Sequence, residues 1–252
     1  MIITSKSNPK IKEIASLKDK KFRKKSGLFV VEGYKMVSEA LTAKKSVVLL
    51  VGVAEGLARF SCYEIDKIEV SEEVLSYVSD AVTPQGVLAV LKEEYQEPKT
   101  PINPCVLLDG VSDPGNIGTI IRTCAAVGVK DVYLVDCCDV YSPKAVRSSM
   151  SGIFFVNLTV LKREDVYSVM ADTPIIVADM NGESVFSFTP PEKYCLVIGN
   201  EANGVSKEVR DLASHTVKIP MSSHSESLNA GVSLAVILYE FTEGKGKSLI
   251  TK

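Results

Sequence analysis

Three loops in the second half of the chain carry polar side chains that packing alone does not explain. The first lies between Leu108 and Gly128 and contains Asn116 and Arg122. It reads as a buried strand, a turn rich in Gly, Asp and Pro, and a helix with Asn116 at the expected N-cap. Helical geometry separates Asn116 and Arg122 by ~120° around the axis, so Arg122 flanks the apolar face and can point toward a cleft.

Such a strand, glycine loop and helix can cradle a phosphate group, because backbone N–H groups point out of a helix N-terminus. The two common phosphate-binding patterns, G-x-x-x-x-G-K-S/T and G-x-G-x-x-G, are both absent from it. Taken by itself, this loop therefore also fits a capped turn that carries an exposed arginine.

The second loop follows an apolar strand directly and reads Gly199-Asn200-Glu201-x-x-Gly204. Open α/β sheets bind ligands at the carboxyl ends of their strands. A glycine at such an end lets the backbone approach a ligand closely, and Asn200 and Glu201 can reach polar groups of a substrate. A plain turn remains the alternative.

The third loop is serine-rich and precedes a strongly apolar helix. Ser225 or Ser227 is a natural N-cap, so Ser227 and Asn229 together exceed what capping requires. The run Ser223-His224-Ser225 suggests a hydrolase, but adjacent residues rarely face one another and no G-x-S-x-G nucleophile elbow is present.

The elements that position these loops alternate between strand and helix. In the first half, the apolar pattern predicts helices at 8–17, 34–43 and 71–78, and strands at 28–31, 47–53, 65–70 and 86–91. The second half has continuous apolar strands at 106–108, 132–135, 156–160, 175–178 and 196–198. Such strands, with helices between them, predict a parallel sheet covered on both faces. The last helix, expected from Ser227 to about Glu240, is apolar nearly all round and is expected to be buried.

Composition excludes several classes of protein. The chain has 252 residues, 46% of them hydrophobic, with ordinary Gly and Pro contents, so it is neither collagen-like nor disordered. No apolar run reaches the ~18 to 20 residues of a bilayer span, and no secretory signal is seen, so no membrane partner is expected. Six scattered cysteines without a C-x-x-C pair suit a reduced, cytoplasmic protein, and two histidines argue against a metal site.

Charge is distributed unevenly along the chain. The net charge is −2, but residues 1–25 hold nine Lys or Arg against Glu13 and Asp19, a local charge of +7. Such asymmetry suggests a nucleic-acid-binding end on an otherwise acidic protein, although a solvated helix end is the simpler alternative. The candidate RNA contacts are Lys20, Lys21, Arg23, Lys24 and Lys25.

Taken together, the three loops resemble the three signature motifs of the SpoU/TrmH branch of the SPOUT RNA methyltransferases. The matching segments are Asn116-Ile-Gly with Arg122, Gly199-Asn-Glu-x-x-Gly204, and Ile219-Pro-Met with Glu226-Ser-Leu-Asn-Ala230. The first half, with Ser7-Asn-Pro-Lys-Ile-Lys and Phe29-Val-Val-Glu-Gly33, resembles that family's ribosomal-protein-like substrate-binding domain. Three motifs in order, behind a basic domain, make the resemblance specific over nearly the whole chain.

The resemblance implies an α/β protein of two domains: a ribosomal-protein-like RNA-binding domain at 1–92, and a SPOUT domain at 105–252 with a parallel sheet and a deep trefoil knot. The polar segment 93–104, which holds three prolines, is the expected linker. The resemblance also implies a homodimer with composite sites. A knot departs from the general rule that chains are unknotted, and here the resemblance overrides that rule.

The resemblance further implies methyl transfer from S-adenosylmethionine to a ribose 2′-hydroxyl. Backbone at Gly199, Ile219, Met221 and Leu228 is expected to hold the cofactor, and the positions that match the family's catalytic residues are Asn116, Arg122, Glu201, Ser227 and Asn229. Ser223 departs from the pattern where a glycine is common, and Ala230-Gly231 departs where Val-Ser is usual. These departures concern the shape of the third loop.

The chemistry requires a positioned hydroxyl whose developing alkoxide is stabilised. An arginine with a pKa above ~12 is a poor general base, so we expect Arg122 to clamp phosphate and stabilise the alkoxide. Glu201 is expected to orient Arg122 or to accept a ribose hydrogen bond. The sequence does not decide whether the substrate is rRNA or tRNA, and we expect rRNA. A non-catalytic RNA-binding protein and a small-molecule α/β enzyme are the alternatives, and the basic first domain speaks against the second.

Overall fold

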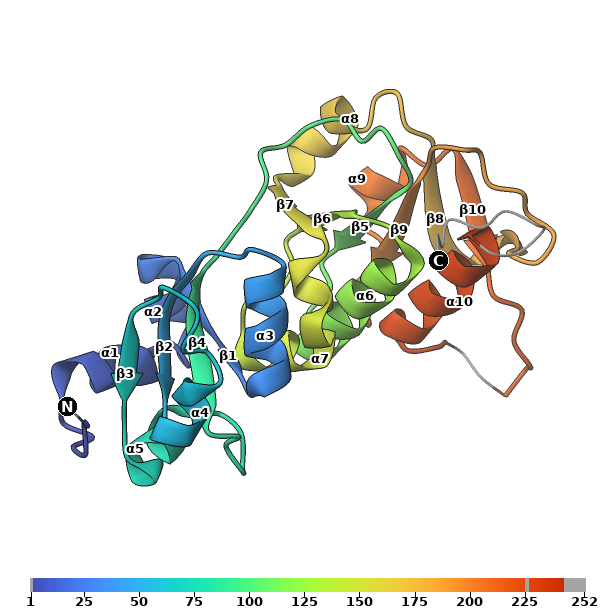
Figure 1. The fold of residues 1–252 in the computed structure, drawn as a ribbon. Coiled ribbons are helices and arrows are strands. Elements are labelled where there is room, and N and C mark those ends of the chain that lie inside the picture. The colour runs from blue at the N-terminus through green and yellow to red at the C-terminus, as the bar shows by residue number, and fades with distance from the viewer. Residues whose placement is uncertain (1, 225–226, 243–252) are drawn as a thin grey trace. The chain divides into compact units, whose positions relative to one another are not determined.

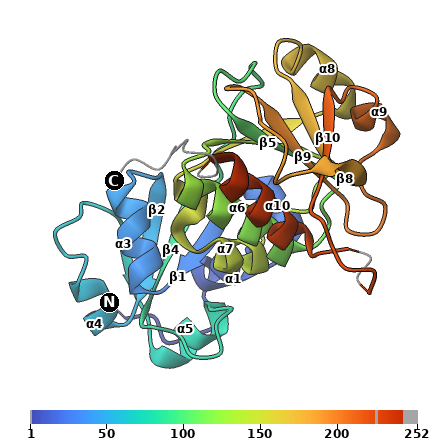
Figure 2. The ribbon, with the colours of Figure 1, turned by 90° about the vertical axis from the view of Figure 1, so that its right-hand side faces the viewer.

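The computed structural model describes residues 2–224 and 227–242 of the chain. The chain folds into two compact units, one formed by residues 1–94 and 141–154 and the other by residues 95–140 and 155–252. Figure 1 and Figure 2 show their helices and strands in two perpendicular views.

The first unit is a four-stranded sheet with helices around it. The strand order is β1-β4-β2-β3; β4 runs antiparallel to β1 and β2, whereas β2 and β3 are parallel. Its strands are β1 (Leu28–Glu32), β2 (Val47–Gly52), β3 (Lys67–Glu69) and β4 (Val87–Lys92). Its helices are α1 (Pro9–Ser16), α2 (Lys20–Ser26), α3 (Tyr34–Thr42), α4 (Ala54–Ala58), α5 (Glu72–Val78), α7 (Pro143–Ser149) and the 3-10 turn η1 (Met150–Phe154).

Side-chain caps mark where helices α1 and α5 of this unit begin. Asn8 accepts a hydrogen bond from the Lys10 N–H at 2.9 Å, and Ser71 caps α5 as its sequence position predicts. Helices α1 and α5 then bury apolar faces against the sheet, with Ile11 and Val74 among the fully buried residues. The predicted α/β character of this half is therefore confirmed.

Residues 141–154 come from the second half of the sequence but pack into the first unit. The ring of Tyr141 lies 4.4 Å from that of Phe29, centroid to centroid, and the Tyr141 hydroxyl donates to the Glu94 carbonyl at 2.8 Å. The predicted limits 1–92, 93–104 and 105–252 assign this segment to the SPOUT domain. Those limits stay a prediction, and the structure adds that the segment packs with the substrate-binding half.

The second unit is built on a six-stranded sheet in which each neighbouring pair of strands is parallel, in the order β10-β8-β9-β5-β6-β7. The predicted parallel sheet is thus confirmed. The strands are β5 (Cys105–Asp109), β6 (Asp131–Val135), β7 (Asn157–Leu161), β8 (Ile175–Ser184), β9 (Cys195–Gly199) and β10 (His215–Lys218). The helices are α6 (Pro114–Val127), α8 (Val166–Val169), α9 (Lys207–Arg210), α10 (Ala230–Thr242) and the 3-10 turn η2 (Arg163–Asp165).

The central strands are buried on both faces, as continuous apolar runs require. All of β5 is buried, and α8 and α9 pack on the face that carries Leu107 and Val197. Helices α6 and α10 lie side by side in both views (Figures 1 and 2). Gly231 permits their close approach, since a Cβ there would lie 2.9 Å from the Thr119 Cγ2 atom.

The last helix differs from its prediction in two respects. It begins at Ala230 rather than at Ser227, and only one face is buried, through residues such as Leu234 and Ile237. Val232 and Tyr239, on the other face, are 46% and 44% exposed. Among the helices that the structure describes, none combines the length and the apolar character needed to cross a membrane.

Candidate active site

A cavity of about 690 Å³ opens at the carboxyl ends of β8, β9 and β10, beside the start of α10. This is the edge of a parallel sheet where ligands are expected to bind. Seven of the nine catalytic and cofactor residues predicted from the sequence line it: Gly199, Glu201, Ile219, Met221, Ser227, Leu228 and Asn229. The remaining two, Asn116 and Arg122, lie on α6.

The first loop is capped differently from the prediction. Asp113, not Asn116, is the N-cap of α6, and its Oδ1 atom accepts the Asn116 N–H at 3.0 Å. Pro114 occupies the first helical position, where its missing N–H leaves no donor unpaired. Asn116 therefore sits one turn further in, and its side-chain amide is available to other loops.

Glu201 receives four hydrogen bonds from the first loop. Ser112 donates its N–H at 3.1 Å and its hydroxyl at 2.9 Å, Asp113 donates its N–H at 3.1 Å, and the Asn116 Nδ2 atom donates at 2.8 Å. Partial burial raises the pKa of Glu201, but the bonds from Asn116 and from the backbone N–H groups outweigh it and lower the pKa to about 2. Glu201 is thus ionised at neutral pH and is a weak base.

Asn229 joins the third loop to the same cluster. Its Nδ2 atom donates to the Asn116 Oδ1 atom at 2.7 Å, while its own Oδ1 atom accepts the N–H groups of Gly231 and Val232 at 2.9 and 3.3 Å. Asn229 therefore performs the N-cap function that the sequence assigned to Ser225 or Ser227. Ser225 lies outside the described residues, and Ser227 is exposed on the cavity wall. The chain Glu201–Asn116–Asn229 holds the three loops together.

Gly199 is required by the fold of the second loop itself. A Cβ atom there would lie 2.2 Å from the backbone carbon of Gly204, because Asn200 and Gly204 exchange backbone hydrogen bonds of 2.9 Å. The prediction assigned this glycine to close approach of a ligand. In the structure, the atoms nearest to a Cβ at Gly199 are instead backbone atoms of Gly204 and Val205, in the same loop.

A polar cluster that the sequence did not predict lies at the base of this loop. The Asp109 carboxylate, with a side chain 1% exposed, accepts from Arg163 Nη1 at 2.5 Å and from the Ser206 N–H at 2.7 Å. Arg163 also donates to Asp136 at 2.8 Å and to the Ser206 hydroxyl. The base of the second loop is thereby tied to the ends of β5 and β6. The one available signal was Asp109, an acid directly after a buried strand.

Arg122 does not line the cavity. It is exposed on α6, and its guanidinium makes neither a hydrogen bond nor an ion pair with any residue inside 2–224 or 227–242. The expectation that Glu201 orients Arg122 does not hold for this structure, since Glu201 is bonded to Ser112, Asp113 and Asn116 instead. Arg122 is left facing solvent.

The predicted RNA-contacting residues separate into two groups. Lys20, Lys21, Lys24 and Lys25 are exposed on α2. Arg23 is only 3% exposed, and its Nη1 atom donates to the carbonyl oxygens of Leu17 and Lys18 at 2.7 and 2.8 Å. It thus satisfies carbonyl groups at the end of α1, where no further helical N–H is available. In this structure Arg23 supports the fold and is not exposed to a ligand.

Comparison with known proteins gives matches over both halves of the chain. Residues 103–239 match the SpoU rRNA Methylase family, and residues 8–89 match the MRM3-like substrate binding domain. The chain is 30% identical to the 23S rRNA (guanosine(2553)-2′-O)-methyltransferase RlmP of Bacillus subtilis (strain 168), over 94% of this chain and 97% of that protein.

Solved structures of methyltransferases are similar to this chain. An AdoMet-bound rRNA methyltransferase from Sinorhizobium meliloti superposes with a TM-score of 0.86 at 28% identity, over 95% of this chain and 96% of that one. The SpoU methyltransferase AviRb from Streptomyces viridochromogenes, in complex with AdoMet, gives a TM-score of 0.83 at 30% identity, over 92% and 96%.

Proposed function

Because this chain belongs to the SpoU rRNA Methylase family, we propose that it transfers a methyl group from S-adenosylmethionine to a ribose 2′-hydroxyl of 23S rRNA. The observation that carries the proposal is the cavity lined by the second and third loops, to which the first loop is joined through the hydrogen bonds of Asn116 with Glu201 and Asn229. The choice of 23S rRNA over tRNA rests on relatives such as RlmP, whose name specifies that substrate.

The residues around the cavity fit S-adenosylmethionine. A volume of about 690 Å³ lies in the range of small-molecule sites. Met221 and Leu228, each 38% exposed, offer apolar surface for a planar adenine ring, and the Gly199–Gly204 loop presents backbone at the other side. When bound, the sulfonium supplies the electrophilic methyl group.

The protein's contribution is to position the hydroxyl and to stabilise its developing negative charge. Glu201, whose pKa is about 2, is too weak a base to take the proton, and it already binds donors of the first loop. Its role is to fix the positions of the three loops relative to one another through the hydrogen bonds of Asn116 and Asn229. Arg122, a permanent cation without a partner among residues 2–224 and 227–242, is suited to bind the phosphate and stabilise the alkoxide.

We further propose a homodimer whose interface includes α10. Val232 and Tyr239 expose apolar surface on one face of this helix, as a helix that packs against a partner does. A second copy could then bring the exposed Arg122 of one protomer to a site built by the other, which accounts for its distance from the cavity wall in the single chain. The knot of the family stays a prediction alongside the dimer.

RNA capture belongs, in this proposal, to the first unit. Four exposed lysines on α2, Lys20, Lys21, Lys24 and Lys25, supply positive charge for phosphate contacts. The match to a substrate-binding domain over residues 8–89 supports the assignment. We place the protein in the cytoplasm, where free thiols such as those of its six cysteines persist.

The proposal is tested by incubating the purified chain with tritium-labelled S-adenosylmethionine and either 23S rRNA transcripts or bulk tRNA. We expect label in a 2′-O-methylnucleoside from 23S rRNA only. Cofactor and RNA binding without transfer to either substrate would identify instead a non-catalytic RNA-binding protein of the same fold. Transfer to tRNA alone would contradict the assigned substrate.

A further inference from the structure

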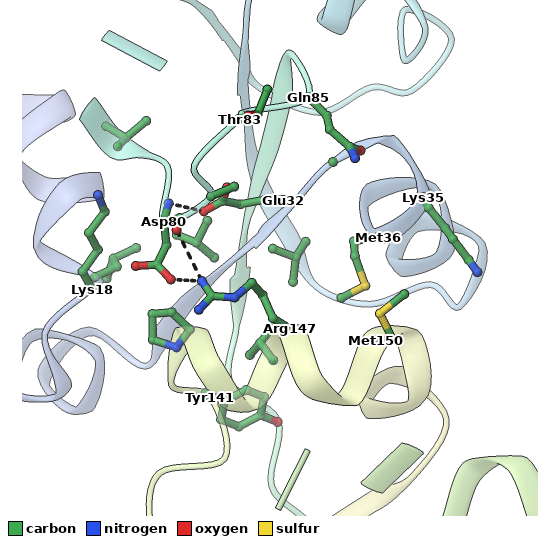
Figure 3. Close-up of a pocket in the computed structure, with 18 residues that line it drawn as sticks. Lys18, Glu32, Lys35, Met36, Asp80, Thr83, Gln85, Tyr141, Arg147 and Met150 are labelled. Carbon is green, nitrogen blue, oxygen red and sulfur yellow. Dashed lines mark hydrogen bonds and ion pairs between the residues drawn. The ribbon is translucent and has the colours of Figure 1, made fainter. Parts of the chain in front are cut away.

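A second cavity, of about 390 Å³, lies entirely within the first unit. It is bounded by β1, the start of α3, the loop before β4, and α7 with the following turn. Figure 3 shows Met36 and Met150 facing each other on one side, with Arg147 reaching from α7 toward Asp80 on the other. The cavity belongs to the unit that matches a substrate-binding domain, and the proposed methyl transfer does not use it.

The open edge of β1 supplies hydrogen-bonding groups to this cavity. Among the strands that the structure describes, β1 pairs with β4 alone. The hydrogen bonds from Glu93 N–H to Gly27 O and from Gly33 N–H to Val87 O show which residue pairs of the two strands are hydrogen-bonded. Because such pairs alternate along an antiparallel ladder, Val30 and Glu32 direct their N–H and C=O groups away from β4. Both residues line the cavity, so a ligand there meets a row of backbone donors and acceptors.

The charged residues of the cavity wall are three cations, Lys18, Lys35 and Arg147, and two carboxylates, Glu32 and Asp80. The Glu32 carboxylate accepts from the Ser79 hydroxyl at 2.5 Å and from the Asp80 N–H at 2.6 Å, while Asp80 pairs with Arg147. The Lys18 ammonium donates to the Ser79 carbonyl at 2.6 Å, and Lys35, with a side chain 70% exposed, lies 4.0 Å from a Glu39 carboxylate oxygen. Three cations against two carboxylates give the wall a net charge of +1, which favours a ligand that carries negative charge.

Met150 combines exposure with an unusual backbone. Its φ of 50° and ψ of −140° place a residue with a side chain in a region that such residues rarely adopt. Its side chain is nevertheless 41% exposed, on the cavity wall. Strain of this kind is found at ligand-binding positions, where the surrounding structure imposes it. Thioethers also pack well against aromatic rings.

We propose that this cavity binds one unpaired nucleobase of the RNA substrate. The flat ring packs between the thioethers of Met36 and Met150, and its polar edge bonds the outward groups of β1. Lys18 and Lys35 lie beside the flanking phosphates. RNA is read in this way, through unstacked bases, where single-stranded loops are recognised. The inference rests on the proposed function, since it names how the same RNA is selected.

An extended peptide added to β1 is the competing occupant, because open strand edges accept such strands. The excess of cations around the cavity and the lysines of the same unit favour RNA. The length of open edge also favours a single base, since only Val30 and Glu32 of β1 combine outward backbone groups with a place on the wall.

A matched pair of variants tests the proposal in the full-length protein. Ala81 lines the cavity, whereas the next residue, Val82, is fully exposed. We expect Ala81→Trp to fill the cavity and to weaken binding of a 23S rRNA transcript by about tenfold, the order expected for loss of one stacked base. Val82→Trp is expected to bind as the wild type does, and affinity for S-adenosylmethionine is expected to be unchanged in both.

A second readout does not depend on whether Ala81→Trp folds. Transcripts that contain 4-thiouridine or 6-thioguanosine are crosslinked to wild type and to the Met36→Ala/Met150→Ala double variant. We expect crosslinks to the peptides that hold Met36 or Met150, and their loss in the double variant. If wild type methylates the transcript but crosslinks only elsewhere, or if both tryptophan variants bind alike, the base site is wrong while the methyltransferase function stands. Absence of RNA binding by wild type would instead contradict the proposed function.

Discussion

At the scale of single residues, Glu201 is a carboxylate whose pKa the fold lowers strongly. Its pKa is lowered from 4.5 to about 2 by donors that exist only in the folded chain. A depressed folded-state pKa contributes stability above the unfolded value and loses it as pH falls through the folded value. The contribution of Glu201 is therefore complete above about pH 5 and is lost between about pH 4.5 and 2.

Replacing Glu201 with Gln should remove this pH-dependent contribution. We expect the free energy of unfolding of wild type, measured by urea titration at several pH values, to fall more steeply below pH 4.5 than that of Glu201→Gln. Other carboxylates titrate in both proteins, so the difference between the two curves is the quantity to compare. Parallel curves would show that the four donors do not stabilise the carboxylate.

Arg122 is expected to be needed for methyl transfer and not for the stability of the fold. Because its side chain is exposed and has no partner among residues 2–224 and 227–242, Arg122→Ala should leave the melting temperature and cofactor affinity unchanged. Methyl transfer should be abolished if the guanidinium stabilises the alkoxide, with partial recovery in Arg122→Lys, which keeps the charge but loses the planar fork. Near-normal transfer by Arg122→Ala would remove it from the mechanism.

The parts of the candidate site that follow from a local sequence pattern were predictable. Polar residues directly after buried strands predicted the edge at which Glu201 and Gly199 lie, and the order of the motifs predicted Asn116 and Asn229. The Asp109–Arg163 pair was not predictable, because the two residues stand 54 positions apart and neither matches a motif. Which of two nearby polar residues caps a helix also depended on loop geometry, as Asp113 and Asn229 show.

At the scale of elements, α2 joins two kinds of basic residue in one short helix. Arg23 bonds the carbonyl oxygens at the end of α1, while Lys24 and its neighbours face solvent. The charge pattern of the sequence grouped these residues together, because composition does not report burial. Their energetic roles are expected to differ accordingly.

Two sets of alanine variants separate the roles of the α2 residues. Arg23→Ala should lower the free energy of unfolding by ~2 kcal/mol, since buried carbonyl groups lose a charged donor, and should affect stability more than RNA affinity. Replacing Lys20, Lys21, Lys24 and Lys25 with Ala should leave stability nearly unchanged and flatten the dependence of log K on log salt by up to ~2.8, at ~0.7 per single-strand contact. Equal salt slopes for the quadruple variant and wild type would show that the lysines are merely solvated.

Continuously apolar strands were predictable, whereas helices of one turn were not. The buried strands β5, β6 and β9 follow from continuous apolar runs, which have no stable position outside a covered sheet. Helices α4 and α9, of five and four residues, carry too little periodicity to be recognised. They exist because tertiary packing stabilises them.

At the scale of the whole molecule, the segment 141–154 shows what sequence order conceals. It lies between two strands of the second unit and packs into the first through Tyr141 and Phe29. Local pattern predicted its helix but not the unit it joins, because packing partners distant in sequence leave no local signature.

The proposed dimer is open to a direct test. Val232→Lys together with Tyr239→Lys places two charges on the exposed face of α10 and should convert a dimer into a monomer, as measured by sedimentation velocity. Val82→Lys, at a fully exposed apolar position in the other unit, is the control and should stay dimeric. A wild type that sediments as a monomer at micromolar concentration would contradict the dimer.

We propose that this protein methylates one ribose 2′-hydroxyl of 23S rRNA. The most direct measurement maps 2′-O-methylated nucleotides by primer extension in rRNA from cells with and without the protein, and from cells that carry Arg122→Ala. We expect one 23S rRNA position that is methylated only when the wild-type protein is present. An rRNA methylation map that is identical in all three strains would contradict it.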